Sequence, residues 1–207
     1  MTQQQHGTIA TKHTQVAIIG SGFSGLGMAI RLKGEGRHSF RIFEKNDGIG
    51  GTWRQNHYPG CACDVQSHVY SYSFEPNPEW TRMFAPQEEI RQYLEHCADK
   101  YRIRPHIHLN KPLTEAEWDE SRALWQLKDN QGREFTASVL VSGMGALSIP
   151  AYPDIPGTDR FQGKAFHSQD WDHDYDLTGK RIAVIGTGAS AIQFVPEVQK
   201  EAGQLYL

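Results

Sequence analysis

Two glycine-rich segments have the residue types and spacing to bind phosphate groups. The first, Gly20-Ser-Gly22-Phe-Ser-Gly25, follows the apolar run Val16–Ile19. In this pattern the first glycine permits a tight turn, the second lets a pyrophosphate approach the backbone, and the third allows close packing of helix on strand. Backbone N–H groups at the start of the following helix would hold the phosphates. The segment therefore predicts a dinucleotide site.

A carboxylate is placed to complete this first site. Glu44 ends a second expected strand, Phe40–Phe43, and lies 44 minus 25, or 19, residues after Gly25. An acid about 20 residues beyond the glycines typically accepts hydrogen bonds from ribose hydroxyls and would repel a 2′-phosphate. The site therefore favours FAD or NAD over NADP. The alternative is a glycine turn that binds no ligand.

The second segment, Gly186-Thr-Gly188-Ala-Ser-Ala191, repeats the pattern after the apolar run Ile182–Ile185. Alanine at the third position is a variant that the fingerprint allows. Two such units predict two dinucleotides and are typical of flavin enzymes in which a nicotinamide delivers hydride to FAD. The residue that distinguishes NAD from NADP is expected about 20 residues beyond the glycines, after Leu207, so the residues present leave this choice open.

Hydrophobic periodicity predicts the elements that position these segments. A strand at 16–19, a helix over the following turns and a strand at 40–43 form the start of a parallel sheet. Residues 45–73 read as a loop, and a helix is expected from about Pro86 to Lys100. Short strands are expected at 113–118, 125–128, 135–137 and 139–141, with a hairpin turn at 129–132 and a non-helical crossing at 150–157.

We therefore expect an α/β fold of two dinucleotide-binding (Rossmann-like) domains with a small antiparallel β insertion, the second domain being truncated. The expected limits are 15–148 for an FAD-binding domain, 149–179 for a linker and 180–207 for the start of the second domain.

Composition narrows the class of protein. The 207 residues contain 21 Lys and Arg against 24 Asp and Glu, a formal charge of −3, so a nucleic-acid partner is not expected. Three cysteines form no disulfide framework and favour the cytoplasm. No apolar run approaches the roughly 18 residues of a membrane helix. The polar, glutamine-rich stretch Met1–Thr14 is expected to be an arm outside the fold.

Two longer motifs carry a family resemblance. Residues 50–64 read Gly-Gly-Thr-Trp-Arg-Gln-Asn-His-Tyr-Pro-Gly-Cys-Ala-Cys-Asp, and residues 161–172 read Phe-Gln-Gly-Lys-Ala-Phe-His-Ser-Gln-Asp-Trp-Asp. Both resemble motifs of the Baeyer-Villiger monooxygenases, within the larger group of flavin-containing monooxygenases. The second motif, here called the fingerprint segment, ends in a tryptophan that related N- and S-oxidising enzymes usually lack.

The resemblance implies an enzyme that uses FAD, NADPH and O2 to insert one oxygen atom into a ketone, giving an ester or lactone. An N- or S-oxidising flavin monooxygenase, which would take a heteroatom substrate, and a nucleotide-binding protein without catalysis are the alternatives. The family's catalytic arginine matches none of the arginines here, so the resemblance implies an N-terminal fragment without full turnover. The FAD contacts that it implies are Gly20, Gly22, Phe23, Ser24, Gly25, Glu44, Gly51, Thr52, Trp53, Asp64, Tyr70 and Leu113.

The resemblance also implies contacts with the nicotinamide nucleotide. Asp64 is the expected catalytic residue, because its carboxylate could accept a hydrogen bond from the nicotinamide amide and orient that ring. The alternative is that Asp64 caps the turn after Gly60. The other implied contacts are Ala62, Cys63, Gly186, Thr187, Gly188, Ala189, Ser190, Ala191 and Ile192.

Three further features could suggest a general acid, a metal site or a redox pair. His167 in the fingerprint segment is expected to have a structural or hinge role rather than that of a general acid. His106 and His108 lack a further ligand at recognisable spacing, so no metal is expected. Cys61 and Cys63 could form a redox pair, but the surrounding motif already explains the segment.

Overall fold

The computed structural model describes residues 12–207, and the chain divides into two compact units. The first comprises residues up to 49 together with 101–144, and the second comprises 50–100 together with 145–207. The expected domain limits at 148 and 179 stay a prediction.

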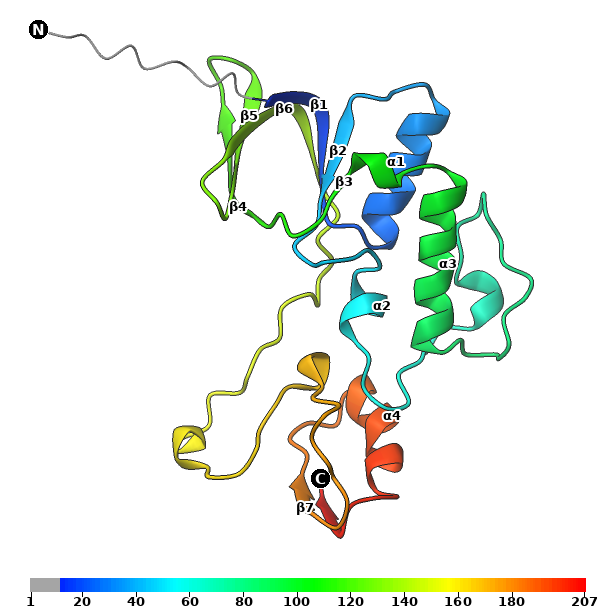
Figure 1. Ribbon diagram of the computed structural model, residues 1–207, viewed down its shortest axis with the longest axis vertical. Coiled ribbons are helices and arrows are strands. Elements are labelled where there is room, and N and C mark those ends of the chain that lie inside the picture. Colours follow the sequence, from blue (N-terminus) through cyan, green and yellow to red (C-terminus); the bar gives the residue numbers. More distant parts are fainter. Residues whose placement is uncertain (1–11) are drawn as a thin grey trace, which may run out of the picture. The chain divides into compact units, whose positions relative to one another are not determined.

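The first unit is a six-stranded sheet with one helix, α1, beside it (Figure 1). The strand order is β3-β2-β1-β6-β5-β4, in which β3, β2, β1 and β6 pair in parallel while β5 and β4 pair antiparallel. The elements are β1 (Lys12–Ile19), α1 (Phe23–Gly34), β2 (Phe40–Phe43), β3 (Ile107–His108), β4 (Leu113–Asp119), β5 (Leu124–Asp129) and β6 (Glu134–Ser142). The parallel half confirms the βαβ arrangement.

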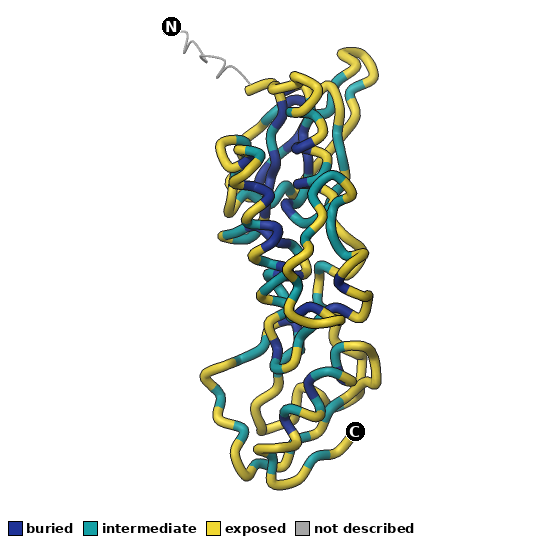
Figure 2. Tube along the Cα trace, turned by 90° about the vertical axis from the view of Figure 1, so that its right-hand side faces the viewer, coloured by how far each residue is buried: buried dark blue, intermediate teal, exposed yellow. Residues whose placement is uncertain are grey.

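The apolar runs of the sequence form the core of this unit. Ala17 and Ile18 in the middle of β1 are fully buried, and Leu26 and Ala29 are fully buried on α1. Burial of these positions removes apolar surface from water and fixes the register of the parallel strands. Figure 2 shows buried residues of the chain in dark blue.

The N-terminal arm predicted for Met1–Thr14 is wrong for its last three residues. Lys12, His13 and Thr14 are part of β1 and pair with Phe135, Thr136 and Ala137 of β6. Backbone pairing and a hydrogen bond between the His13 ring and the Thr136 hydroxyl hold them, although their side chains are polar. Residues 1–11 of the predicted arm lie outside the described residues.

The antiparallel insertion is present, but its last strand differs from the prediction. The strands expected at 135–137 and 139–141 are one strand, β6, whose N-terminal half pairs with β5 and whose whole length pairs with β1. The insertion therefore continues the central sheet instead of forming a separate one.

The second unit contains two longer helices and a two-stranded parallel sheet. Its elements are α2 (Thr52–Gln55), α3 (Gln87–Lys100), β7 (Arg181–Ala183), α4 (Ala189–Val198) and β8 (Gln204–Tyr206). The expected helix at 86–100 is confirmed: Ile90, Leu94 and Cys97 are fully buried along one face, and acidic residues occupy the first turn, where the helix dipole favours them. The predicted loop 45–73 contains the short helix α2 and a 3-10 turn at 67–69.

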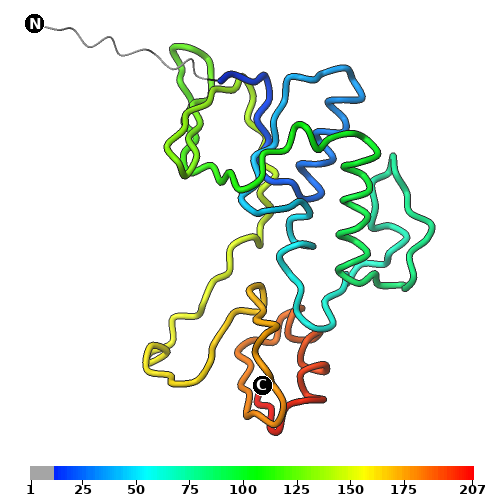
Figure 3. The backbone as a smooth tube through the Cα atoms, viewed as in Figure 1, coloured from blue at the N-terminus to red at the C-terminus, as the bar shows by residue number. Residues whose placement is uncertain are grey.

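The crossing at 150–157 is non-helical, as predicted. Residues 145–165 are exposed almost throughout and run as an extended segment with one 3-10 turn (Figure 3). Among residues 12–207, no helix is long and apolar enough to cross a membrane.

Candidate functional site

The first glycine turn has the backbone geometry that phosphate binding requires. Gly20 follows β1 with φ of +90°, a conformation that side chains other than glycine rarely adopt. Gly22 is the N-cap of α1 and supplies no side chain to cap the helix, so the first N–H groups of α1 are available to a ligand. A Cβ on Gly25 would lie 1.9 Å from the carbonyl oxygen of Gly20. Helix and turn therefore touch through their backbones.

Glu44 lies directly beside this turn. One carboxylate oxygen accepts hydrogen bonds from the backbone N–H of Ser21 at 2.8 Å and from its hydroxyl at 2.7 Å, and the other accepts from the N–H of Asn46 at 2.9 Å. Glu44 is 3% exposed. Since a carboxylate has about four acceptor positions, one more donor, such as a ribose hydroxyl, can be accommodated. The carboxylate also holds the turn in place, which the sequence pattern did not predict.

Gly143 is a residue of this site that the sequence analysis missed. It follows β6, its N–H donates to the Ile19 carbonyl at 2.8 Å, and a Cβ there would lie 2.9 Å from the same oxygen. A Cβ on Gly20 would in turn lie 2.6 Å from the Gly143 carbonyl oxygen. The signal in the sequence was a glycine directly after a predicted strand, which marks a close approach of backbones.

The second glycine turn is open to solvent. Gly186 has φ of +117°, Gly188 is the N-cap of α4 without a capping side chain, and a Cβ on either glycine would meet nothing within 4 Å. Ala191, at the third position of the motif, is buried. The start of α4 therefore presents unpaired N–H groups beside empty space, which suits an anionic group.

A third cluster lies in the segment that follows the first strand pair. Gly50 and Gly51, both with positive φ, lead into α2, where Trp53 is buried. The Trp53 indole N–H donates to the Tyr70 hydroxyl at 3.1 Å, and the two rings meet edge to face at 5.6 Å. Thr52 beside them is exposed. Trp53 and Tyr70 thus hold each other in a fixed pair of rings.

Asp64 is exposed close to this pair. Burial is the larger cause that raises the pKa of Tyr70 and of Cys63, and the negative charge of Asp64 adds to both shifts. Within residues 12–207, the Asp64 carboxylate makes no hydrogen bond to the turn at Gly60.

Gln193 on α4 connects the second glycine turn to the Tyr-Pro-Gly segment. Its side-chain oxygen accepts from the Tyr58 hydroxyl at 2.9 Å and from the Ala62 N–H at 3.3 Å, and its amide N–H donates to the Ala62 carbonyl at 2.8 Å. A Cβ on Gly60 would lie 2.8 Å from the Gln193 carbonyl oxygen. We call this arrangement the Gln193 clamp. It was missed because a glutamine within a helix has no distinctive sequence signal.

Burial raises the pKa of Tyr58 to about 12. The Tyr58 phenol therefore stays protonated at neutral pH and remains a donor to Gln193.

The fingerprint segment packs on the same helix. The centroid of the Trp171 ring lies 5.2 Å from that of Phe194 on α4. The centroid of the Tyr58 ring lies 5.9 Å from that of the same Phe194 ring. His167 accepts a hydrogen bond from the Gln169 N–H at 3.1 Å and so caps the 3-10 turn at 168–170. This contact supports a structural role for His167.

The structure thus groups the predicted residues into two sets, one in each unit. The first unit brings together Gly20, Gly22, Phe23, Ser24, Gly25 and Glu44 around one turn, whereas Leu113 at the start of β4 packs against the core cluster of Ala17, Phe43, Leu127 and Ala137. The second unit holds Gly51, Thr52, Trp53, Ala62, Cys63, Asp64, Tyr70 and residues 186–192.

The redox pair of Cys61 and Cys63 and the metal site at His106 and His108 gain no support. Cys61 and Cys63 are both free thiols, and burial raises the pKa of each, which lowers the fraction of reactive thiolate. His106 lies in a 3-10 turn, not on a strand, and only His108 is in β3. No group of three potential metal ligands occurs within residues 12–207.

Comparison with known proteins decides the family. The model of the flavin-binding monooxygenase-like family matches residues 13–207. The chain belongs to this family.

Within the flavin-binding monooxygenase-like family, the chain is similar to proteins named Baeyer-Villiger monooxygenase. One, from Pseudomonas aeruginosa, is 67% identical over 190 residues, which are 92% of this chain and 36% of the relative. Another, from Streptomyces coelicolor, is 55% identical over 196 residues, 95% of this chain and 38% of the relative. These relatives confirm the resemblance that the two long motifs carry.

A solved structure agrees with the fold. Cyclohexanone monooxygenase from Rhodococcus sp. Phi1, bound to NADP+, superposes with a TM-score of 0.88 at 34% identity over 95% of this chain and 38% of that chain. The α/β fold with a parallel sheet and an antiparallel extension is therefore confirmed. The chain spans less than two fifths of the length of these relatives.

Proposed function

We propose that this chain forms the FAD- and NADPH-binding part of a Baeyer-Villiger monooxygenase, which uses O2 to insert one oxygen atom into a ketone and yields an ester or lactone. The observation that supports this function best is the convergence of both long motifs on α4. Tyr58 from the first motif and Trp171 from the fingerprint segment contact the same ring, Phe194, one turn beyond the second glycine turn.

The first glycine turn fits the pyrophosphate of FAD. Its backbone N–H groups at Gly22 and Phe23 are uncapped, and the close contact between Gly20 and Gly25 leaves no room for side chains. Glu44 would accept a hydrogen bond from a ribose hydroxyl with the acceptor position that Ser21 and Asn46 leave. The buried Trp53 ring, held by the half-buried Tyr70, would provide a rigid apolar surface for the flavin part.

The second glycine turn fits the pyrophosphate of the nicotinamide nucleotide. The start of α4 supplies the N–H groups, and the Gln193 clamp fixes that helix against Ala62. Similarity to a cyclohexanone monooxygenase bound to NADP+ supports NADPH as the reductant.

Asp64 would orient the nicotinamide by accepting a hydrogen bond from its amide. The carboxylate is exposed and next to the Trp53 and Tyr70 rings, and the Cys63 N–H, bonded to the Ala85 carbonyl at 2.9 Å, anchors the backbone beside it. Bound FAD would supply the chemistry that the side chains lack, accepting hydride and activating O2. The chain's own contribution is to hold the two cofactors in a reactive orientation and to keep water away.

A graft tests the proposed function. Residues 13–207 of this chain would replace the matching residues of the Pseudomonas aeruginosa relative, which is 67% identical there. We expect the graft to bind FAD and to convert a cyclic ketone to its lactone with NADPH and O2, measured by mass spectrometry of the product. Oxidation of a thioether without any ester would instead favour the N- or S-oxidising class. Cofactor binding without oxygen consumption would favour a nucleotide-binding role alone.

Asp64→Asn in the same graft tests the orientation of the nicotinamide. We expect the rate of flavin reduction by NADPH, followed by stopped-flow absorbance, to fall roughly tenfold to a hundredfold, because a misplaced reactant loses part of the advantage of alignment. FAD binding should not change. Asp154→Asn, in the exposed crossing, is the matched control. Equal rates for both variants would exclude the role of Asp64.

A further inference from the structure

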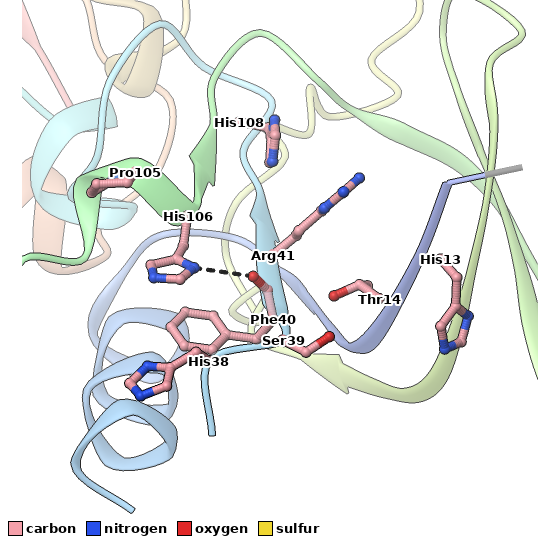
Figure 4. A pocket seen from close by; sticks show the side chains of 9 residues that line it. All are labelled: His13, Thr14, His38, Ser39, Phe40, Arg41, Pro105, His106 and His108. Atoms are coloured by element: carbon pink, nitrogen blue, oxygen red, sulfur yellow. Dashed lines mark hydrogen bonds between the residues drawn. The ribbon is translucent and has the colours of Figure 1, made fainter. Parts of the chain in front are cut away.

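A pocket of about 330 Å³ lies in the first unit, apart from the glycine turn (Figure 4). It is bounded by the N-terminal end of β1, the start of β2 and the segment that leads into β3, whereas the glycine turn lies after the other end of β1. The pocket is lined by His13, Thr14, His38, Ser39, Phe40, Arg41, Pro105, His106 and His108. The residues that line the pocket thus include four histidines, one arginine and two residues with hydroxyl groups, but no carboxylate.

The charged groups that shift the pKa of His106 and of His108 are cations. Burial lowers the pKa of His108 most, and the cations Arg41, Lys12, Lys111 and His106 lower it further. For His106, burial again comes first, followed among charged groups by Lys33 and His38. No carboxylate is among the groups that act on either ring. Like charges gathered at a partly buried surface repel one another, and a bound anion would relieve that repulsion.

Arg41 is the residue best placed to hold an anion. Within residues 12–207, its guanidinium has no hydrogen bond or ion pair with another side chain. A guanidinium offers five N–H donors in a planar fork that matches the oxygens of a phosphate group. Figure 4 shows Arg41 and His108 extending toward the same side of the pocket.

The histidine rings are held in place by aromatic contacts. His106 stacks on Phe40 at 4.1 Å, and its Nδ1 lies 3.3 Å from the Phe40 carbonyl oxygen. A carbonyl only accepts, so Nδ1 carries the proton and the neutral ring leaves Nε2 as an acceptor. Protonation turns Nε2 into a second donor, so an anion in the pocket and a proton on His106 would stabilise each other.

We propose that this pocket binds an oxyanion of the phosphate class, with Arg41 as its principal ligand and the ring of His108, which stacks on Phe43 on the same face of β2, as an additional donor. The source would be a free phosphate or pyrophosphate, or the phosphate group of a small metabolite. The site is independent of the two glycine turns and of the proposed function.

Calorimetric titration of the 207-residue chain with inorganic pyrophosphate, inorganic phosphate and AMP tests the proposal. We expect saturable binding that Arg41→Gln weakens about tenfold, since a charge-assisted hydrogen bond is lost. Arg122→Gln, in the exposed turn between β4 and β5, is the matched control and should bind as the wild type does. Neither Arg41→Gln nor Arg122→Gln changes a glycine turn, so binding that only Arg41→Gln weakens belongs to this pocket and not to the turns. Stronger binding of AMP than of the inorganic ions would identify a metabolite phosphate as the source.

The pH dependence of binding is measured with sulfate, because the charge of sulfate is constant between pH 5.5 and pH 8. Lowering the pH should increase sulfate affinity several-fold as His106 and His108 become protonated. The other ionisable groups at or near the pocket are His13, His38, Lys12, Lys33, Arg41 and Lys111. His106→Gln together with His108→Gln should flatten this dependence. Unchanged pyrophosphate binding in Arg41→Gln, equal loss in Arg122→Gln, or a pH-independent sulfate affinity in the wild type would overturn the proposal.

Discussion

Replacement of Gly25 by alanine is expected to abolish FAD binding and to lower the free energy of unfolding of the first unit by roughly 3 kcal/mol or more. The added Cβ would lie 1.9 Å from the Gly20 carbonyl oxygen, a contact that no rotamer can relieve because both groups belong to the backbone. Helix α1 would have to move away from the turn, and its N–H groups would leave the positions that hold the pyrophosphate.

Gly34→Ala is the control for this prediction, because it makes the same substitution in the same helix. Gly34 has a helical conformation and nothing within 4 Å of its Cβ position, so alanine there should stabilise α1 by about 0.5–1 kcal/mol. The measurements are urea unfolding followed by circular dichroism and the quenching of flavin fluorescence during titration. If Gly25→Ala bound FAD with the affinity of Gly34→Ala, the assignment of the turn to the pyrophosphate would be wrong.

Local patterns of the sequence predicted the parts of the fold that depend on local physics. The strand at 40–43 was predicted with the bounds that the structure has, because a short segment with three large apolar residues ends there on a charged residue. The helix at 86–100 was predicted because its stripe of buried positions repeats every three to four residues. The glycine turns followed from conformations that only glycine adopts easily.

Long-range pairing explains what the sequence did not predict. The polar residues Lys12–Thr14 extend β1 only because β6, more than 120 residues later, offers backbone groups to pair with. β6 was divided in two at Ser138, a polar residue that is exposed in the structure and interrupts the apolar pattern of the sequence. A strand whose two halves face different neighbours has no single periodicity to detect.

In the candidate site too, local sequence patterns predicted some features, while others depend on long-range contacts. Glu44 was predicted from its spacing to the glycines, but its bonds to Ser21 and Asn46, which hold the turn, depend on the folded backbone. Gly143 and Gln193 were missed because their importance lies in what they approach. Each contacts a segment more than 100 residues away in the sequence, and neither a glycine after a strand nor a glutamine within a helix shows which segment that is.

Loss of the Gln193 clamp is expected to have the second large effect. Gln193→Leu removes three hydrogen bonds and leaves the Tyr58 hydroxyl and both backbone groups of Ala62 without their partner on α4. Because unsatisfied buried polar groups cost about 1–3 kcal/mol each, we expect the free energy of unfolding of the second unit to fall by roughly 3 kcal/mol. The affinity for NADP+ should fall about tenfold, since the start of α4 would no longer be held.

Three further variants separate the clamp from general damage to the helix. Gln199→Leu, at the exposed C-terminal end of α4, changes the same residue type and should leave both quantities unaltered. Gln193→Glu keeps the acceptor for Tyr58 but loses the donor to the Ala62 carbonyl, so its effect should be intermediate. Tyr58→Phe combined with Gln193→Leu should cost less than the sum of the two single variants, because they share one hydrogen bond. Two outcomes would show that α4 binds the nucleotide without help from the Tyr-Pro-Gly segment. One is that the losses of unfolding free energy in Tyr58→Phe and Gln193→Leu simply add in the double variant. The other is that the affinity for NADP+ falls in Gln199→Leu but not in Gln193→Leu.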